Sequence, residues 1–137
     1  MFEQSRYCLH RRVNGSFSEV VDATRAALAT EGFGVLTEID VKAPLAKKLD
    51  VTMPPYLILG ACNPGLAHRA LGLDPAIGTL LPCNVVVAED ADGRISVAAI
   101  DPRAMFAVVD DPALAPIVDD ARARLERALA ALPDAGP

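Results

Sequence analysis

The stretch "YLILGACNPGLAHRALGLDPAIGTLLPCNVVV", residues 56–87, contains the pair Cys-Asn twice, 21 residues apart. A continuous apolar run precedes Cys62-Asn63 and predicts a buried, central strand over residues 56–62. Asn63-Pro64 predicts the start of a helix, because asparagine is a favoured N-cap and proline loses no needed hydrogen bond at the first helical position. Pro82 predicts that the next strand begins at Cys83, since proline is tolerated at the first position of a strand and not in its middle.

The residues before this stretch predict further strands and helices. Residues 6–13 and 33–41 alternate apolar and polar side chains, which is typical of strands. Between them, Ser16 and Glu19 have the spacing of a capping box, and Gly32 suits the end of a helix, so a helix is expected there. Residues 42–51 predict a short helix.

The residues after this stretch predict a hairpin and a closing helix. Strands are expected at 83–90 and 94–101, because Gly93 between them can adopt the positive φ of a tight turn. Asp101-Pro102 predicts a short helix near Met105. Asp111-Pro112 opens a long amphipathic pattern that extends to Leu132.

No linker or low-complexity segment divides the chain, so residues 1–137 are interpreted as a single domain, with a frayed tail at 133–137. Strands follow one another late in the sequence and an amphipathic helix closes it. This order predicts an α+β fold of two layers, in which helices cover a mostly antiparallel sheet.

Composition and charge exclude some classes of function. The net charge is −5, and an acidic surface repels phosphate backbones, so nucleic-acid binding is not expected. No run of 18 apolar residues occurs, so a membrane span is not expected either. The first residues lack the apolar segment of a signal peptide, and three cysteines suit a reducing compartment, so a cytoplasmic location is expected.

Several motifs together resemble the domain-of-unknown-function 302 family. They are "GF.VL.EIDV" from Gly32, "PYLILGACNPGLA" from Pro55, "LLPCNVVV" from Leu80, "DG" at Asp92 and "DP..M" at Asp101. The resemblance covers about residues 16–110. It implies a two-layer α+β fold of strand-helix-four strands-helix type, similar in arrangement to the TATA-binding-protein fold, and it implies no particular activity or cofactor.

Cys62, Asn63, Cys83 and Asn84 are the candidate binding residues. If the two strands are antiparallel, the end of one meets the start of the other at the same edge of the sheet, and the four residues converge. A helix N-terminus beside Cys62 would stabilise a thiolate or an anionic ligand. The alternative is that both cysteines pack as small hydrophobic residues.

The two asparagines carry separate predictions. Asn63 is expected to accept a hydrogen bond from the backbone N–H near Leu66, as an N-cap does. Asn84 enters a strand, where asparagine is uncommon. Its amide is therefore expected to point into the shared edge, toward Asn63 or a bound ligand.

A metal site has weaker support. Cys8 and His10 share a face of the first strand, and His68 lies on the helix after Pro64, but no close pair of cysteines accompanies them. No metal ligand is therefore assigned, and no glycine-rich phosphate loop or GxSxG motif is present.

The sequence leaves three functions open and names no reaction. The first is a binding module for a small-molecule ligand, with its pocket at the Cys-Asn edge. The second is a structural or interaction protein that acts as a homo-oligomer, for which a dimer is expected, through a face or an edge of its sheet. The third is a thiol oxidoreductase that uses Cys62 and Cys83.

Overall fold

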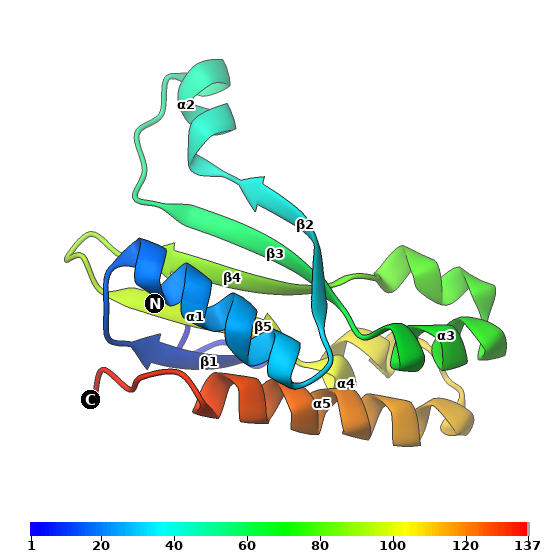
Figure 1. The fold of residues 1–137 in the computed structure, drawn as a ribbon. Coiled ribbons are helices and arrows are strands. Elements are labelled where there is room, and N and C mark those ends of the chain that lie inside the picture. Colours follow the sequence, from blue (N-terminus) through cyan, green and yellow to red (C-terminus); the bar gives the residue numbers. More distant parts are fainter. Residues whose placement is uncertain (137) are drawn as a thin grey trace.

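A computed structural model describes residues 1–136, in which five strands form one antiparallel sheet of order β1-β5-β4-β3-β2 (Figure 1). The strands are β1 (Cys8–Val13), β2 (Gly34–Asp40), β3 (Tyr56–Cys62), β4 (Cys83–Glu89) and β5 (Ile95–Ile100). This sheet with its helices confirms the predicted α+β class. The hairpin expected around Gly93 is present, and Gly93 has a φ of +79°.

Five α-helices join or follow the strands: α1 (Phe17–Thr30), α2 (Lys42–Leu49), α3 (Pro64–Leu73), α4 (Pro102–Met105) and α5 (Ala115–Ala130). Three short 3-10 helices complete the connections: η1 (Pro75–Leu80), η2 (Phe106–Val108) and η3 (Pro112–Leu114). Within residues 1–136, none of the helices has the length and the apolar character needed to cross a bilayer.

Helices α1 and α5 lie side by side and form the second layer of the fold (Figure 1). Every second residue of the central strands points toward them, as the period of a strand requires, and is buried. Leu59, Val85 and Val97 pack there with Val20 of α1 and Leu125 of α5. The capping box predicted for α1 is present, because Ser16 Oγ accepts from the backbone N–H of Glu19 and Glu19 accepts from that of Ser16.

A second apolar core lies beyond one end of the sheet, where α3, η1, α4 and the first half of α5 meet. Leu66 and Ala70 of α3, Phe106, and Ile117 and Ala121 of α5 are all buried in it. The chain between β3 and β4 therefore forms a small helical layer of its own, and the two Cys-Asn pairs lie where this layer meets the sheet.

The two edge strands of the sheet differ. Along β1, the chain after α5 adds a short antiparallel bridge between Val13 and Asp134, and Ala135 donates its N–H to the carbonyl of Arg12 at 3.1 Å. The frayed tail expected at 133–137 is therefore wrong for its first residues, because they satisfy backbone groups of an edge strand, and Pro137 lies outside the described residues. Within the described part of the chain, no backbone segment pairs with the outer edge of β2.

Helix α2 stands apart from the rest of the molecule at the end of β2 (Figure 1). None of its residues is buried against the described part of the chain. Asp40, one residue before the N-cap Val41, accepts with its Oδ1 from the backbone N–H groups of Lys42 and Ala43 at 3.0 and 3.3 Å.

Candidate functional site

The two cysteines of the Cys-Asn pairs lie on neighbouring strands. β3 and β4 are antiparallel, and the residue directly opposite Cys83 is Ala61, one position before Cys62. The end of β3 and the start of β4 therefore meet, as the antiparallel arrangement predicts. The two cysteines are offset by one position and are not a directly opposed pair, and all three cysteines are free.

Both thiols border one pocket at the junction of the two apolar cores. Its walls come from the sheet end, from α3 and from α5, and its lining is almost wholly apolar. The lining residues used below are Phe33, Cys62, Asn63, Ala67, Cys83 and Phe106. The cavity volume is about 30 Å³. Cys62, Asn63 and Ala67 are only partly buried, so the pocket reaches the surface beside the start of α3.

Cys83 forms a buried wall of this pocket. It is 7% exposed, and burial, with a smaller contribution from the neighbouring Cys62, raises the pKa of its thiol to about 11. At neutral pH it is therefore a protonated, weakly polar group, and its thiolate is not available as a nucleophile. Cys62 is half-buried, so it is the more accessible of the two thiols.

Asn63 is the N-cap of α3, as predicted. Its Oδ1 accepts from the backbone N–H of Leu66 at 3.2 Å, and its Nδ2 donates to the carbonyl of Glu31 at 3.5 Å. Gly32 lies against this side chain, and a Cβ built there would come within 2.9 Å of Nδ2, at a φ of +84°. A glycine is required here both by the close approach and by the left-handed backbone.

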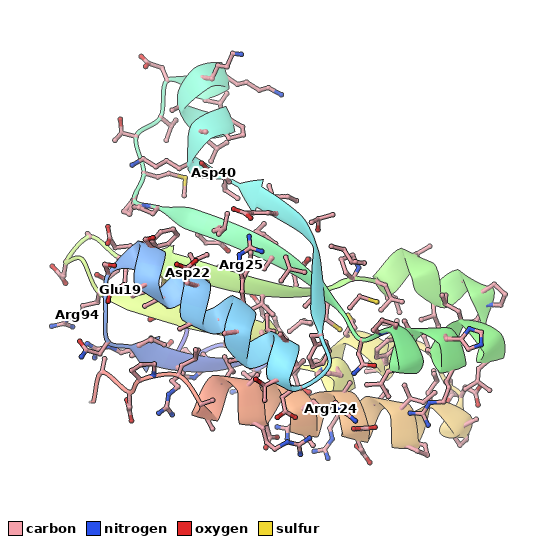
Figure 2. All side chains as sticks on the ribbon, in the orientation of Figure 1. Glu19, Asp22, Arg25, Asp40, Arg94 and Arg124 are labelled. Atoms are coloured by element: carbon pink, nitrogen blue, oxygen red, sulfur yellow. The ribbon has the colours of Figure 1, made fainter. Side chains whose placement is uncertain are left out.

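Arg124 of α5 completes this junction, and sequence reasoning missed that role. It forms an ion pair with Asp120, four residues earlier, at 2.8 Å. Arg124, labelled on α5 in Figure 2, also donates from Nη1 to the carbonyl of Glu31 at 2.9 Å. Asn63 donates to the same carbonyl, so α1, α3 and α5 meet at one oxygen. No local pattern signals a contact between residues 93 positions apart.

Asn84 does not join the other three candidates, so the expectation that its amide points toward Asn63 is wrong. Consecutive strand residues point to opposite faces of a sheet, and Cys83 takes the face that α1 and α5 cover. Asn84 lies on the other face, where it is exposed and makes no side-chain hydrogen bond to any of residues 1–136. There it borders a separate groove of about 290 Å³ with Tyr56, Val86 and Ile100.

The residues weighed for a metal site stay apart. Cys8 lies on the edge strand β1, opposite Ile100, while His68 is exposed on α3. Across residues 1–136, no group of three or more histidine, cysteine, aspartate or glutamate side chains is placed to hold a metal ion.

The family model described as "Domain of unknown function DUF302" matches residues 9–132. The chain belongs to the DUF302 family. The match extends beyond the resemblance seen at residues 16–110, because it also takes in most of β1 and all of α5.

A solved DUF302 structure has the same fold. The crystal structure of an uncharacterized conserved DUF302 protein from Bacillus stearothermophilus superposes with a TM-score of 0.87 at 30% identity. The alignment covers 93% of this chain and 99% of that one. No curated protein matches the chain.

Proposed function

We propose that this DUF302 protein is a binding module whose ligand occupies the pocket between Cys62, Cys83 and helix α3. The observation that carries the proposal is the shared pocket itself. Two strand ends, a capped helix and the first half of α5 meet around a space that side chains do not fill. Small-molecule sites are commonly concave, mostly apolar and equipped with few polar groups, and this pocket has that character.

The lining supports a compact apolar ligand, or the apolar end of a larger one. A volume of about 30 Å³ holds roughly two water-sized groups. Asn63 uses its side chain to cap α3 and to contact Glu31, so few polar groups are left to fix a polar ligand. A polar part of the ligand would stay at the mouth, beside the partly exposed Asn63 and Ala67.

The thiols support binding better than redox chemistry. A dithiol mechanism needs a thiolate that attacks and a partner thiol within reach. The pKa of Cys83 is raised to about 11, and the residue opposite it is Ala61. We therefore favour Cys83 as part of the apolar wall, and Cys62 as a weakly polar group near the mouth.

Native mass spectrometry of freshly purified protein, followed by methyl NMR under xenon pressure, tests this proposal. Xenon suits a cavity of about 30 Å³, because it is a single atom that enters apolar cavities. We expect shifts confined to methyl groups around Leu66, Leu81 and Ala67. Ala67→Leu, which fills the mouth, should abolish them, and Ala26→Leu on the exposed side of α1 should not. Shifts that persist in Ala67→Leu, or that are absent in the native protein, would contradict the proposal.

A further inference from the structure

The outer edge of β2 is an open site for strand pairing. β1 and β2 are the two edges of the sheet, and the chain around Asp134 covers part of the first. In residues 1–136, no segment pairs with the outer edge of β2. An edge strand presents a row of unpaired N–H and C=O groups, which is a template for another strand.

Apolar side chains gather on the same stretch of chain. Leu36 and Ile39 of β2 are 68% and 50% exposed, and Leu49 and Val51 at the end of α2 are 65% and 44% exposed. They lie within 16 residues of chain, on an edge strand and at or just after the end of a helix that has no fully buried residue. Groups of exposed apolar side chains mark interaction surfaces more often than single scattered ones do.

The carboxylates of β2 do not protect this edge. Charged side chains and bulges commonly discourage edge pairing, and β2 has a bulge between Val35 and Thr37. Its two charges are already engaged, however. Glu38 forms an ion pair with Arg25 of α1, and Asp40 accepts from the first N–H groups of α2 (Figure 2). Leu36 and Ile39 are therefore left as the free side chains of the edge.

The charge of α2 indicates what kind of partner it contacts. All the lysines of the chain, Lys42, Lys47 and Lys48, lie on this helix. The net charge of −5 thus divides into three positive charges on α2 and eight net negative charges elsewhere. The rest of a second copy is therefore complementary to α2. An anionic membrane would repel that remainder, and polybasic lipid-binding segments usually carry about 4–8 basic residues.

We propose that two copies of this chain associate through β2 and α2. The β2 edges pair in antiparallel fashion around a two-fold axis, and each α2 reaches across to the body of the other copy. A two-fold contact uses the same surface on both partners, which one edge strand and one projecting helix satisfy. The area that a seven-residue edge strand can bury is small beside the roughly 800 Å² that each partner buries in a stable interface. We therefore expect α2 to supply the remaining area.

Sedimentation equilibrium of the full chain tests the proposal. We expect a mass of twice 14.4 kDa for the native protein. In Ile39→Lys, the association constant of the dimer should fall by more than about tenfold. Lys47→Glu with Lys48→Glu should also weaken association if α2 contacts the second copy. These residues lie on a helix with no buried residue, so the change leaves the core intact. Val108→Lys is the matched control, because Val108 is 76% exposed on η2 and lies outside the interface.

Three results would overturn the proposal. One is a native protein that stays at 14.4 kDa up to about 1 mM. Another is a dimer that Val108→Lys weakens as much as Ile39→Lys does, because the contact would then lie elsewhere. The third is a monomer that co-sediments with phosphatidylserine vesicles through α2, which would make the helix a membrane contact.

Discussion

Helices α2 and α3 make an instructive comparison, because each follows one strand of the same antiparallel pair, β2 and β3. A side-chain oxygen accepts backbone N–H groups at the start of each helix, from the N-cap Asn63 in α3 and from Asp40, one residue before the N-cap, in α2. Helix α3 then buries Leu66 and Ala70 in the second core, whereas α2 buries nothing in the described chain. Similar capping thus starts both helices, and the surroundings decide which of them contributes to the stability of the monomer.

The largest expected effect contrasts one leucine from each helix. Leu66→Ala should lower the free energy of unfolding by about 2–5 kcal/mol, because it removes a buried side chain and leaves a cavity. Leu49→Ala, at a position 65% exposed, should change it by less than about 0.5 kcal/mol in dilute solution. Urea unfolding of both variants measures the difference. Equal losses would show that α2 packs against the monomer after all.

The next effect concerns the buried thiol. Cys83→Ser should destabilise the protein by about 1–3 kcal/mol, because a hydroxyl would be buried in an apolar wall without a partner. Cys62→Ser, at a partly exposed position, should cost less. Thermal melts of the two variants provide the test, and the reverse order would contradict the burial of Cys83.

The same thiol predicts a pH dependence. The pKa of Cys83 is raised from 9.0 to about 11 in the folded protein, so between these values the unfolded chain releases a proton that the folded chain keeps. Stability should therefore fall as the pH rises from about 9 to about 11. Cys83→Ala should remove this part of the dependence, and Cys62→Ala is the matched control. An unchanged slope in Cys83→Ala would refute the assignment.

The caps of the two helices give a smaller contrast. Asn63→Ala should cost about 1 kcal/mol, because α3 loses its N-cap within a packed core. Asp40→Ala removes the acceptor of the Lys42 and Ala43 backbone N–H groups at the start of α2. It should fray that helix and leave the urea midpoint nearly unchanged. Hydrogen exchange at Lys42 and Ala43 would report the fraying. A loss of global stability in Asp40→Ala as large as that in Asn63→Ala would break the comparison.

The smallest expected effect is at Asn84. It is exposed and forms no side-chain hydrogen bond to the described residues, so Asn84→Ala should alter the free energy of unfolding by less than about 0.5 kcal/mol. It should also leave xenon binding in the pocket unchanged, because it lies on the other face of the sheet. Loss of that binding would return Asn84 to the candidate site.

Local signals in the sequence predicted the elements well. The apolar run before Cys62, the Asn63-Pro64 start of α3, the capping box at Ser16 and the turn at Gly93 all lie within a few residues of the structure they determine. The meeting of Cys62 and Cys83 followed from antiparallel pairing alone. The misplacement of Asn84 was avoidable, because strand alternation sends Cys83 and Asn84 to opposite faces.

Contacts between distant parts of the chain were beyond such reasoning. The bridge of Asp134 to β1, the contact of Arg124 with the Glu31 carbonyl and the contribution of Phe106 to the pocket wall each depend on how helices dock. Propensity and periodicity describe one element at a time, so they predict that a helix forms and not which surface it meets. For the same reason, the sequence predicted α2 without showing that it stands unburied.

A crystal structure of the protein under xenon pressure tests the central claim, that the α3 end of the sheet holds a ligand pocket, most directly. Xenon enters apolar cavities. We expect a xenon atom between Cys62, Cys83 and Ala67, and none in Ala67→Leu. A pocket that stays empty under xenon, or one closed by Phe106, would show that the two cysteines serve only to pack the core.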